Sequence, residues 1–351
     1  MKETPRFFLG ANSKKGFVSY FDGLQEKSNN LQLLILKGGP GSGKSSLMKR
    51  VLKYAIDKGN TVEIVPCASD PESLDAVIDY TAGFAIMDGT APHTLDPRIP
   101  GARGHIMYTG DMWNCDKLSK NTDNIEKLTE TIGDCHKGAS SYIKAAAALL
   151  DENSYLSGKC IDKKAASQVL EEIVSHIKGG GKFKEKKRLL SAVTTGEIKT
   201  FYNTPRHYCD KTYLIQDNYG GFADYIFKTV YEWAILKNEE IILCPCSINP
   251  DKIDHIIFPE SRIALLKSND FLKFDGDEKI DAKEYYSFIP MPHIMEKRLK
   301  KAAELLSEGG SLISDAKFLH DELEAFYVSA MNFKMADGFF DEIKERFYKQ
   351  H

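Results

Sequence analysis

The sequence has no excess of one charge and no long apolar run. Its 351 residues carry 47 Lys and Arg against 50 Asp and Glu, a formal net charge of −3. Proteins that coat nucleic acid usually show a basic excess, so we do not expect a nucleic-acid partner. No apolar run reaches the roughly 18–20 residues that span a bilayer, and the N-terminus has no signal-peptide pattern. We therefore expect a cytoplasmic protein without a membrane span.

Cysteine is sparse and follows no disulfide pattern. The seven cysteines are an odd number, spread along a chain that is long enough to bury cores without cross-links. We therefore expect free thiols in a reducing compartment. Hydrophobic residues make up 42% and charged residues 28%, as in folded globular proteins. The length predicts about two domains.

One segment carries a specific chemical signal. A buried-strand pattern at 33–36 runs into a complete G-x-x-x-x-G-K-[ST] motif, and apolar residues at helical spacing follow it. Glycines let backbone amides approach phosphate oxygens, and the helix N-terminus adds its positive end. The residues predicted to bind nucleotide phosphates are Gly38, Gly39, Pro40, Gly41, Ser42, Gly43, Lys44, Ser45 and Ser46.

Three side chains near this loop have predicted roles. Lys44 would reach the β- and γ-phosphates, and the Ser45 hydroxyl would be a ligand of Mg²⁺. A strand expected at 84–88 carries Asp88 at its carboxyl end, where P-loop NTPases place an outer carboxylate for Mg²⁺. We predict Ser45 and Asp88 as the metal-binding residues. The alternative is an ordinary strand end without a metal.

A long stretch rich in Pro and Gly follows Asp88, and we expect a loop without regular structure up to about residue 114. Ligands bind beyond the carboxyl ends of strands in open α/β sheets, so its charged residues are candidate catalytic groups. His93 could position or activate a water or an acceptor hydroxyl. Arg98 or Arg103 could neutralise charge in the transition state. The alternative is a solvated loop.

The sequence also matches itself. Leu34–Asp88 aligns without a gap with Tyr213–Lys267, and the matched residues include Asp75 with Asp254. The second copy lacks the phosphate-binding residues: in place of Gly38, Gly43, Lys44, Ser45 and Asp88 it has Asp217, Phe222, Ala223, Asp224 and Lys267. We interpret this as a duplication. The second copy is predicted to bind no nucleotide and to have a structural or regulatory role.

The predicted fold class is α/β, with two duplicated P-loop NTPase-like domains. Each is expected to contain a parallel sheet flanked by helices and to end in a helical hairpin. The first domain is predicted at residues 1–187 and the degenerate second at 188–351. We expect a short helix near 70–78, and a solvated linker in the basic run that ends near residue 188.

The tandem arrangement resembles a bacterial family of two-repeat P-loop proteins. The segments that carry the resemblance are LGANSKKGFVSYF, LKGGPGSGKSSLMK and AIMDGTAPHTLDPRIPGA, and it covers nearly the whole chain. That family is known as ATPases or ATP-binding proteins without an assigned biological role, so the resemblance implies ATP use. Both repeats can carry a P-loop in the family, whereas here the second repeat does not.

The leading functional hypothesis is a Mg²⁺-dependent ATP hydrolase with one active site, in the first repeat. ATP is favoured over GTP because no [NT]-K-x-D base-reading element is evident. One alternative is a phosphotransferase that passes the γ-phosphate to a small acceptor. Another is an ATP-gated binding module without enzymatic activity. A protein partner or a homo-oligomer through the second repeat is also considered.

Overall fold

The computed structural model describes residues 4–348 as a mixed α/β structure that divides into two compact units. The N-terminal unit contains residues 4–10, 19–138 and 311–348, and the central unit contains residues 11–18 and 139–310. Each unit therefore combines the sheet of one sequence repeat with helical residues from the end of the other. The units do not follow the linear boundary predicted at 187/188.

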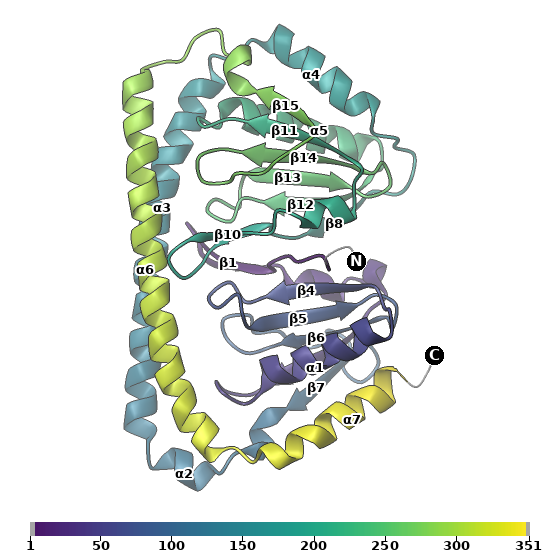
Figure 1. Ribbon diagram of the computed structural model, residues 1–351, viewed down its shortest axis with the longest axis vertical. Helices are drawn as coiled ribbons and strands as arrows, with labels where there is room; N and C mark the ends of the chain where they lie inside the picture. Colours follow the sequence, from purple (N-terminus) through teal and green to yellow (C-terminus); the bar gives the residue numbers. More distant parts are fainter. Residues whose placement is uncertain (1–3, 349–351) are drawn as a thin grey trace. The chain divides into compact units, whose positions relative to one another are not determined.

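The sheet of the N-terminal unit has the strand order β4-β5-β6-β3-β7 (Figure 1). Its strands are β3 (Gln32–Lys37), β4 (Val62–Pro66), β5 (Leu74–Asp79), β6 (Phe84–Asp88) and β7 (Gly104–Tyr108). β5 is antiparallel to β4 and β6, whereas β3 is parallel to β6 and β7. The sheet is therefore mixed, and the prediction of a parallel sheet is wrong.

Two segments of this sheet differ from expectation. Residues 74–79 form β5 rather than a short helix, and all six are buried, which favours a strand covered on both faces. The end of the predicted loop forms β7 at the sheet edge, paired with β3. Residues 89–103 contain no helix or strand, as expected. The carboxyl ends of β3 and β6 thus open toward an irregular segment.

The sheet of the central unit has the order β15-β11-β14-β13-β12-β8. Its strands are β8 (Lys184–Lys187), β11 (Lys211–Gln216), β12 (Glu240–Pro245), β13 (Ile253–Phe258), β14 (Ile263–Ser268) and β15 (Glu278–Asp281). Five of them repeat the order and directions of the first sheet. The register agrees too, since Leu34 pairs with Ile86 and Tyr213 with Leu265.

β8 is an additional edge strand in the basic run where a linker was expected. It pairs in parallel with β12, and its lysines face a carboxylate of that strand. The Nζ atoms of Lys184 and Lys186 lie 3.3 and 3.1 Å from Glu240 oxygens. Opposite charges on neighbouring strands stabilise this pairing, and the charge discourages further edge-to-edge association.

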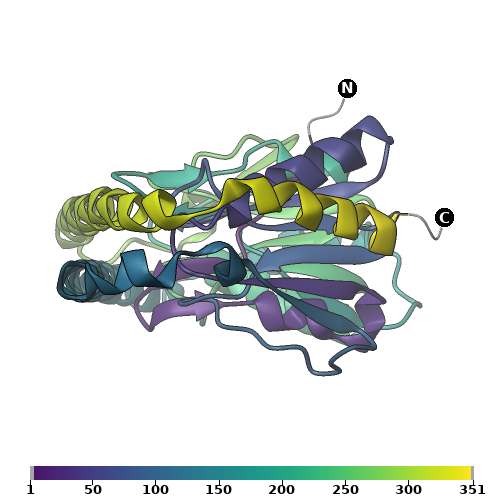
Figure 2. The same ribbon diagram turned by 90° about the horizontal axis from the view of Figure 1, so that it is seen from below.

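Helices cover both sheets. In the N-terminal unit, α7 (Ala336–Phe347) lies along α1 (Lys44–Asp57), and the Arg50 guanidinium sits 4.4 Å from the Phe340 ring centre (Figure 2). In the central unit, α4 (Lys163–Ser175) packs on α5 (Gly221–Leu236). The remaining elements are β1 (Gly10–Ser13), β2 (Gly16–Ser19), β9 (Ser191–Val193), β10 (Ile198–Thr200), α2 (Cys115–Ser119), α3 (Thr122–Gly158) and α6 (Pro292–Ala330).

The helical hairpin predicted at the end of the second repeat is wrong. α6 is one continuous helix that passes through Gly309 and Gly310 without a break. A Cβ on Gly310 would lie 3.1 Å from the backbone of Gly196, and one on Gly309 would lie 3.3 Å from the Ala139 carbonyl oxygen. These glycines therefore permit close packing inside a helix, despite their low helix propensity.

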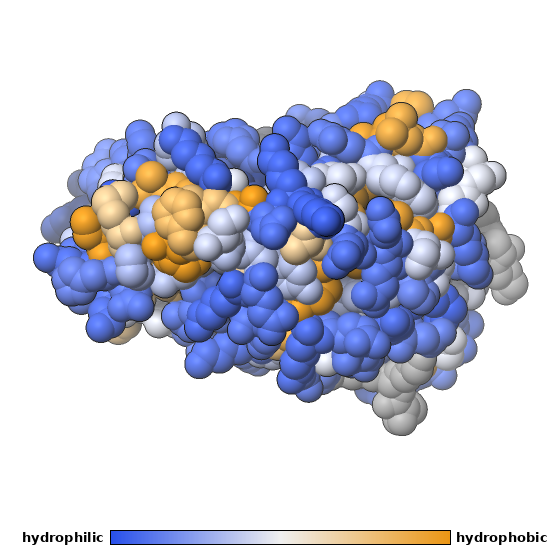
Figure 3. All heavy atoms as spheres, turned by 90° about the horizontal axis from the view of Figure 1, so that it is seen from above, coloured by the Kyte–Doolittle hydropathy of each residue, from blue (hydrophilic) through white to orange (hydrophobic). Residues whose placement is uncertain are grey.

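The surface seen in Figure 3 is largely hydrophilic, with apolar atoms in separate small patches. Among residues 4–348, no helix combines the length and the apolar character needed to cross a bilayer. The exposed large apolar side chains of the central unit include Phe288, Met291 and Ile294.

Close packing at Gly310 generates a stability prediction. Gly310→Ala should lower the free energy of unfolding by about 1–3 kcal/mol, because the added methyl group overpacks against the Gly196 backbone. The matched control is Gly338→Ala in α7, where a Cβ would meet no atom within 4 Å. That change should raise stability by about 0.5–1 kcal/mol. Urea unfolding followed by circular dichroism measures both, and equal effects would contradict the packing argument.

Candidate functional site

The Gly38–Ser45 loop joins an inner strand of the sheet to the N-terminus of a helix, as the motif predicts. β3 ends at Lys37 and α1 begins at Lys44. Gly41 and Gly43 have φ values of 62° and 79°, which glycine adopts without strain. At Gly38, a Cβ would lie 2.0 Å from the Thr109 hydroxyl oxygen. Each of these three positions therefore requires glycine, for conformation or for space.

Lys44 lies inside the curl of this loop. Its side chain is 8% exposed, and its ammonium donates to the carbonyl oxygens of Gly38 at 3.0 Å and Gly39 at 2.8 Å. The ammonium is also 3.6 Å from Oδ2 of Asp88. The structure thus brings together Lys44 and Asp88, two residues that the sequence placed in one site. A buried lysine is costly without a partner, and here Asp88 and the two carbonyl oxygens compensate its charge.

The predicted metal-binding oxygens come from the first turn of α1 and the end of β6. The Ser45 hydroxyl accepts from the Leu74 amide at 3.0 Å. Asp88 accepts, through Oδ1, from the amide and the hydroxyl of Thr90 at 2.9 and 2.6 Å. A hydroxyl and a carboxylate are oxygen donors of the kind that suits Mg²⁺. Ser46 is exposed in the first turn of α1.

His93 lies beside a buried carboxylate that sequence reasoning missed. Its Nε2 atom is 3.4 Å from Oδ1 of Asp75 on β5, and both side chains are buried. Burial lowers the pKa of His93, but the charge and hydrogen bond of Asp75, together with the charge of Asp88, raise it by more, so the pKa lies above its usual value. Asp75 was assigned to a helix, although its identity with Asp254 in the second copy could have singled it out.

The two arginines do not reach the loop through any contact in the described residues. The Arg98 guanidinium is paired with the Asp22 carboxylate on the exposed turn Phe21–Gln25. Arg103 directly precedes β7, which runs parallel to β3 with Gly104 opposite Leu33. It therefore lies at the opposite end of the sheet from Gly38, about 17 Å away at strand spacing. The position of Arg103 does not support the role predicted for it.

The loop is covered by the C-terminal part of α6, which is some 280 positions away in the sequence. Glu324 accepts from the Gly41 amide through Oε1 at 3.2 Å. A Cβ on Gly41 would lie 2.9 Å from Val328, and one on Gly39 would lie 3.0 Å from Tyr327. No local pattern in the sequence predicted this cover. Glu324 also belongs to a half-exposed group with His320 and Asp321 whose ligand atoms lie within 4.8 Å of one another.

The corresponding loop of the central unit is filled by its own side chains. Asp217 takes the place of Gly38 and is buried, and its Oδ2 accepts from the Ala223 amide at 3.0 Å. The Tyr286 hydroxyl donates to the same Oδ2 at 2.9 Å and accepts from the Phe222 amide at 2.7 Å. The Gly221 amide donates to the Ser157 hydroxyl at 3.1 Å. Three amides at the start of α5 therefore have internal acceptors.

At the start of α1 the situation is different. Among residues 4–348, no side chain accepts from the amides of Gly43, Lys44 or Ser45. These amides form the positive end of the helix dipole. The first turn of α1 contains no acidic residue that would compensate this charge. Within the Gly38–Ser45 loop, only the Gly41 amide donates to a side chain of residues 4–348, and its acceptor is Glu324.

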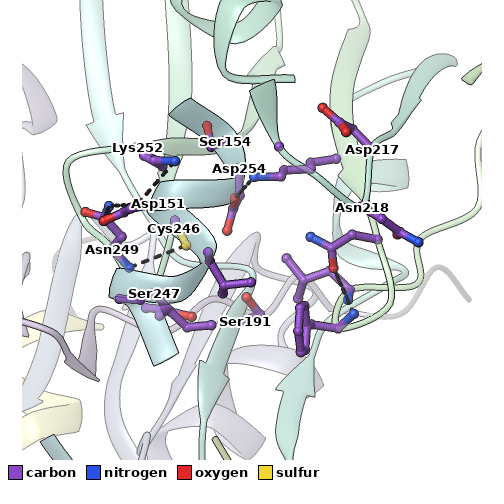
Figure 4. Close-up of a pocket in the computed structure, with 18 of the residues that line it drawn as sticks. Asp151, Ser154, Ser191, Asp217, Asn218, Cys246, Ser247, Asn249, Lys252 and Asp254 are labelled. Carbon is purple, nitrogen blue, oxygen red and sulfur yellow. Dashed lines mark hydrogen bonds and ion pairs between the residues drawn. The ribbon is translucent and has the colours of Figure 1, made fainter. Parts of the chain in front are cut away.

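Charged side chains line the pocket beside the loop of the central unit (Figure 4). The Lys267 ammonium lies 3.3 Å from Asp254 and 3.8 Å from Asp224, and the Lys252 ammonium lies 2.7 Å from Asp224 and 3.2 Å from Asp151. These two lysines and three aspartates form the ion-pair network. Burial would raise the pKa of Asp254, but the charge of Lys267 holds it below its usual value.

Comparison of the chain with protein-family models, curated proteins and solved structures found no match. The resemblance to two-repeat P-loop proteins therefore stays a prediction from the sequence.

The ion-pair network predicts a pH-dependent cost for Asp254→Asn. A carboxyl whose pKa is lowered by folding contributes stability above its unfolded pKa, and this contribution is lost as pH falls through the folded pKa. The variant should lose about 3 kcal/mol of unfolding free energy at pH 7, because Lys267 loses its nearest partner. The loss should be smaller at pH 3.

Urea titrations at the two pH values measure this difference. Asp57→Asn on the exposed face of α1 is the control, and it should change stability by no more than about 0.5 kcal/mol. An equal loss at both pH values for Asp254→Asn would contradict the assigned ion pair.

Proposed function

We propose that the N-terminal unit binds ATP with Mg²⁺ through the Gly38–Ser45 loop and hydrolyses it. The observation that carries the proposal is the buried Lys44 ammonium, which lies 3.6 Å from Asp88. Lys44 is the first residue of α1, and among residues 4–348 no side chain accepts from the first amides of this helix. A cation, a positive helix end and inward amides together suit a polyphosphate. The full motif, in its strand–loop–helix context, supports the same ligand.

The residues fit the expected roles in part. Ser45 and Asp88 would hold Mg²⁺, which supplies charge neutralisation at the phosphates when it is bound. Lys44 would exchange the carbonyl oxygens of Gly38 and Gly39 for phosphate oxygens. His93, with its pKa raised by Asp75, suits a hydrogen-bond donor or a positive charge better than a general base. Arg98 and Arg103 have no role in this proposal.

The second repeat is proposed to bind no nucleotide and to serve a structural role. Asp217 supports this, because its carboxylate already accepts a hydrogen bond from the loop that aligns with Gly38–Ser45. A phosphate there would meet a buried anion with a fixed hydrogen-bond network. The matching order and register of the two sheets support the duplication of a P-loop-like domain as its origin.

A second candidate function is an ATP-gated binding module. Glu324 on α6 accepts from the Gly41 amide, a group that would face phosphate in the proposed complex. Nucleotide binding would therefore displace a carboxylate of α6. A gated module predicts tight ATP binding with negligible turnover, whereas a hydrolase releases phosphate without an added acceptor. A phosphotransferase would need an acceptor for turnover.

The decisive variant is Lys44→Ala. It removes the buried cation, so ATP turnover should fall by about 100-fold or more. Phosphate release from Mg-ATP measures turnover, and titration calorimetry measures binding. The matched control is Ala223→Lys, which adds a lysine at the aligned position of the second copy and should create no second binding site. Wild-type turnover in Lys44→Ala would contradict the proposed site.

Glu324 supplies an independent prediction. Glu324→Gln removes the negative charge beside Gly41, so ATP affinity should rise by about threefold to tenfold. Glu322→Gln on the same helix is exposed and should leave the affinity unchanged. Calorimetric titration of both variants with Mg-ATP checks this. Weaker binding by Glu324→Gln would show that the carboxylate assists the loop rather than competing for it.

A further inference from the structure

Aromatic side chains border the Gly38–Ser45 loop on the side that α6 covers. The Trp113 ring lies 3.2 Å, and the Tyr327 ring 3.0 Å, from a Cβ built on Gly39. The Phe333 ring lies 3.9 Å from a Cβ built on Gly43, at the start of α1. The residues Trp113, Tyr327 and Phe333 are called the aromatic rim below. The segment around Trp113 and the segment Tyr327–Phe333 therefore place aromatic rings near Gly39 and near Gly43 of the loop.

The aromatic rim is held in place by the backbone. The Asn114 amide donates to the Ala330 carbonyl oxygen at 2.8 Å, and the Asn332 amide donates to the Met112 carbonyl oxygen at 2.9 Å. The Trp113 and Tyr327 ring centres are 5.4 Å apart, with the planes tilted by 53°. The backbone hydrogen bonds hold together the two segments that carry the rim, so ligand binding would have to order little backbone.

Two features of the rim have no structural explanation. Phe333 is 47% exposed, although an aromatic ring gains most from burial. The Trp113 indole nitrogen is a buried donor without an acceptor within residues 4–348. A buried donor without a partner costs free energy, so it suggests a ligand that brings an acceptor.

We propose that the aromatic rim binds the purine ring of the nucleotide, with Phe333 stacking on the ring and the Trp113 N–H donating to it. The inference rests on the proposed function, because phosphates in the loop would tether the base beside these side chains. A purine offers both a flat face and ring-nitrogen acceptors. Stacking on aromatic side chains suits any base, so the rim would hold the ring without reading its exocyclic groups.

The test compares ATP with inorganic tripolyphosphate, which has the phosphates but no base. The chain has two tryptophans, so Trp233→Phe leaves Trp113 as the only tryptophan of the full-length protein, and excitation at about 295 nm avoids most tyrosine emission. Both ligands are titrated with Mg²⁺ and followed by Trp113 fluorescence and by calorimetry. ATP should bind about tenfold tighter than tripolyphosphate and should quench Trp113, because its ring meets the indole.

Rim variants assign the difference to side chains. Phe333→Ala should weaken ATP binding by about tenfold and leave tripolyphosphate binding unchanged. Trp113→Phe, followed by calorimetry, should weaken ATP binding alone, because it keeps a ring but removes the N–H group. The matched control is Phe318→Ala, an exposed aromatic residue on α6, which should change neither ligand.

The outcomes separate the two proposals. Equal affinities for ATP and tripolyphosphate, or normal ATP binding by Phe333→Ala, would overturn the aromatic rim as a base site while the loop remains a phosphate site. Binding of neither ligand would overturn the proposed function, and the inference with it. Loss of both ligands in Phe333→Ala would show that this residue supports the loop rather than the base.

Discussion

The backbone amides between a buried strand and the helix that follows it need hydrogen-bond acceptors. The two units supply these acceptors in different ways. In the central unit, Asp217, Tyr286 and Ser157 satisfy the amides from within the protein. In the N-terminal unit, the corresponding loop has Lys44 at its centre, and a carboxylate of α6 reaches only the Gly41 amide. Among residues 4–348, the same backbone arrangement thus has side-chain acceptors for three amides at the start of α5 and, in the N-terminal unit, for the Gly41 amide.

The paired charges of the two sites are exchanged between helix and strand. In the N-terminal unit the cation, Lys44, starts the helix and the anion, Asp88, ends the strand. In the central unit the anion, Asp224, lies on the helix and the cation, Lys267, lies on the strand. A buried charge without a partner is costly, so both positions had to change together. Each site thus pairs a cation with an anion, with the two charges exchanged between helix and strand.

The parts of the fold that the sequence could predict depend on short-range patterns. The buried strand before Gly38, the loop and α1 follow from apolar periodicity and from the motif, and the β6 strand brings Asp88 beside Lys44 as expected. β5 was missed because its pattern starts after Asp70 and Pro71, which are common at helix starts. Asp75 was assigned to the wrong element for the same reason.

Other parts depend on contacts between residues far apart in the sequence. The cover of Glu324, Tyr327 and Val328 over the loop has no local signal. Gly309 and Gly310 have low helix propensity, but tertiary packing keeps them helical. The composition of the two units has a further consequence. Because each core takes helical residues from the other repeat, neither half of the chain contains a complete core. A single cut of the chain between the two repeats would therefore leave both cores incomplete.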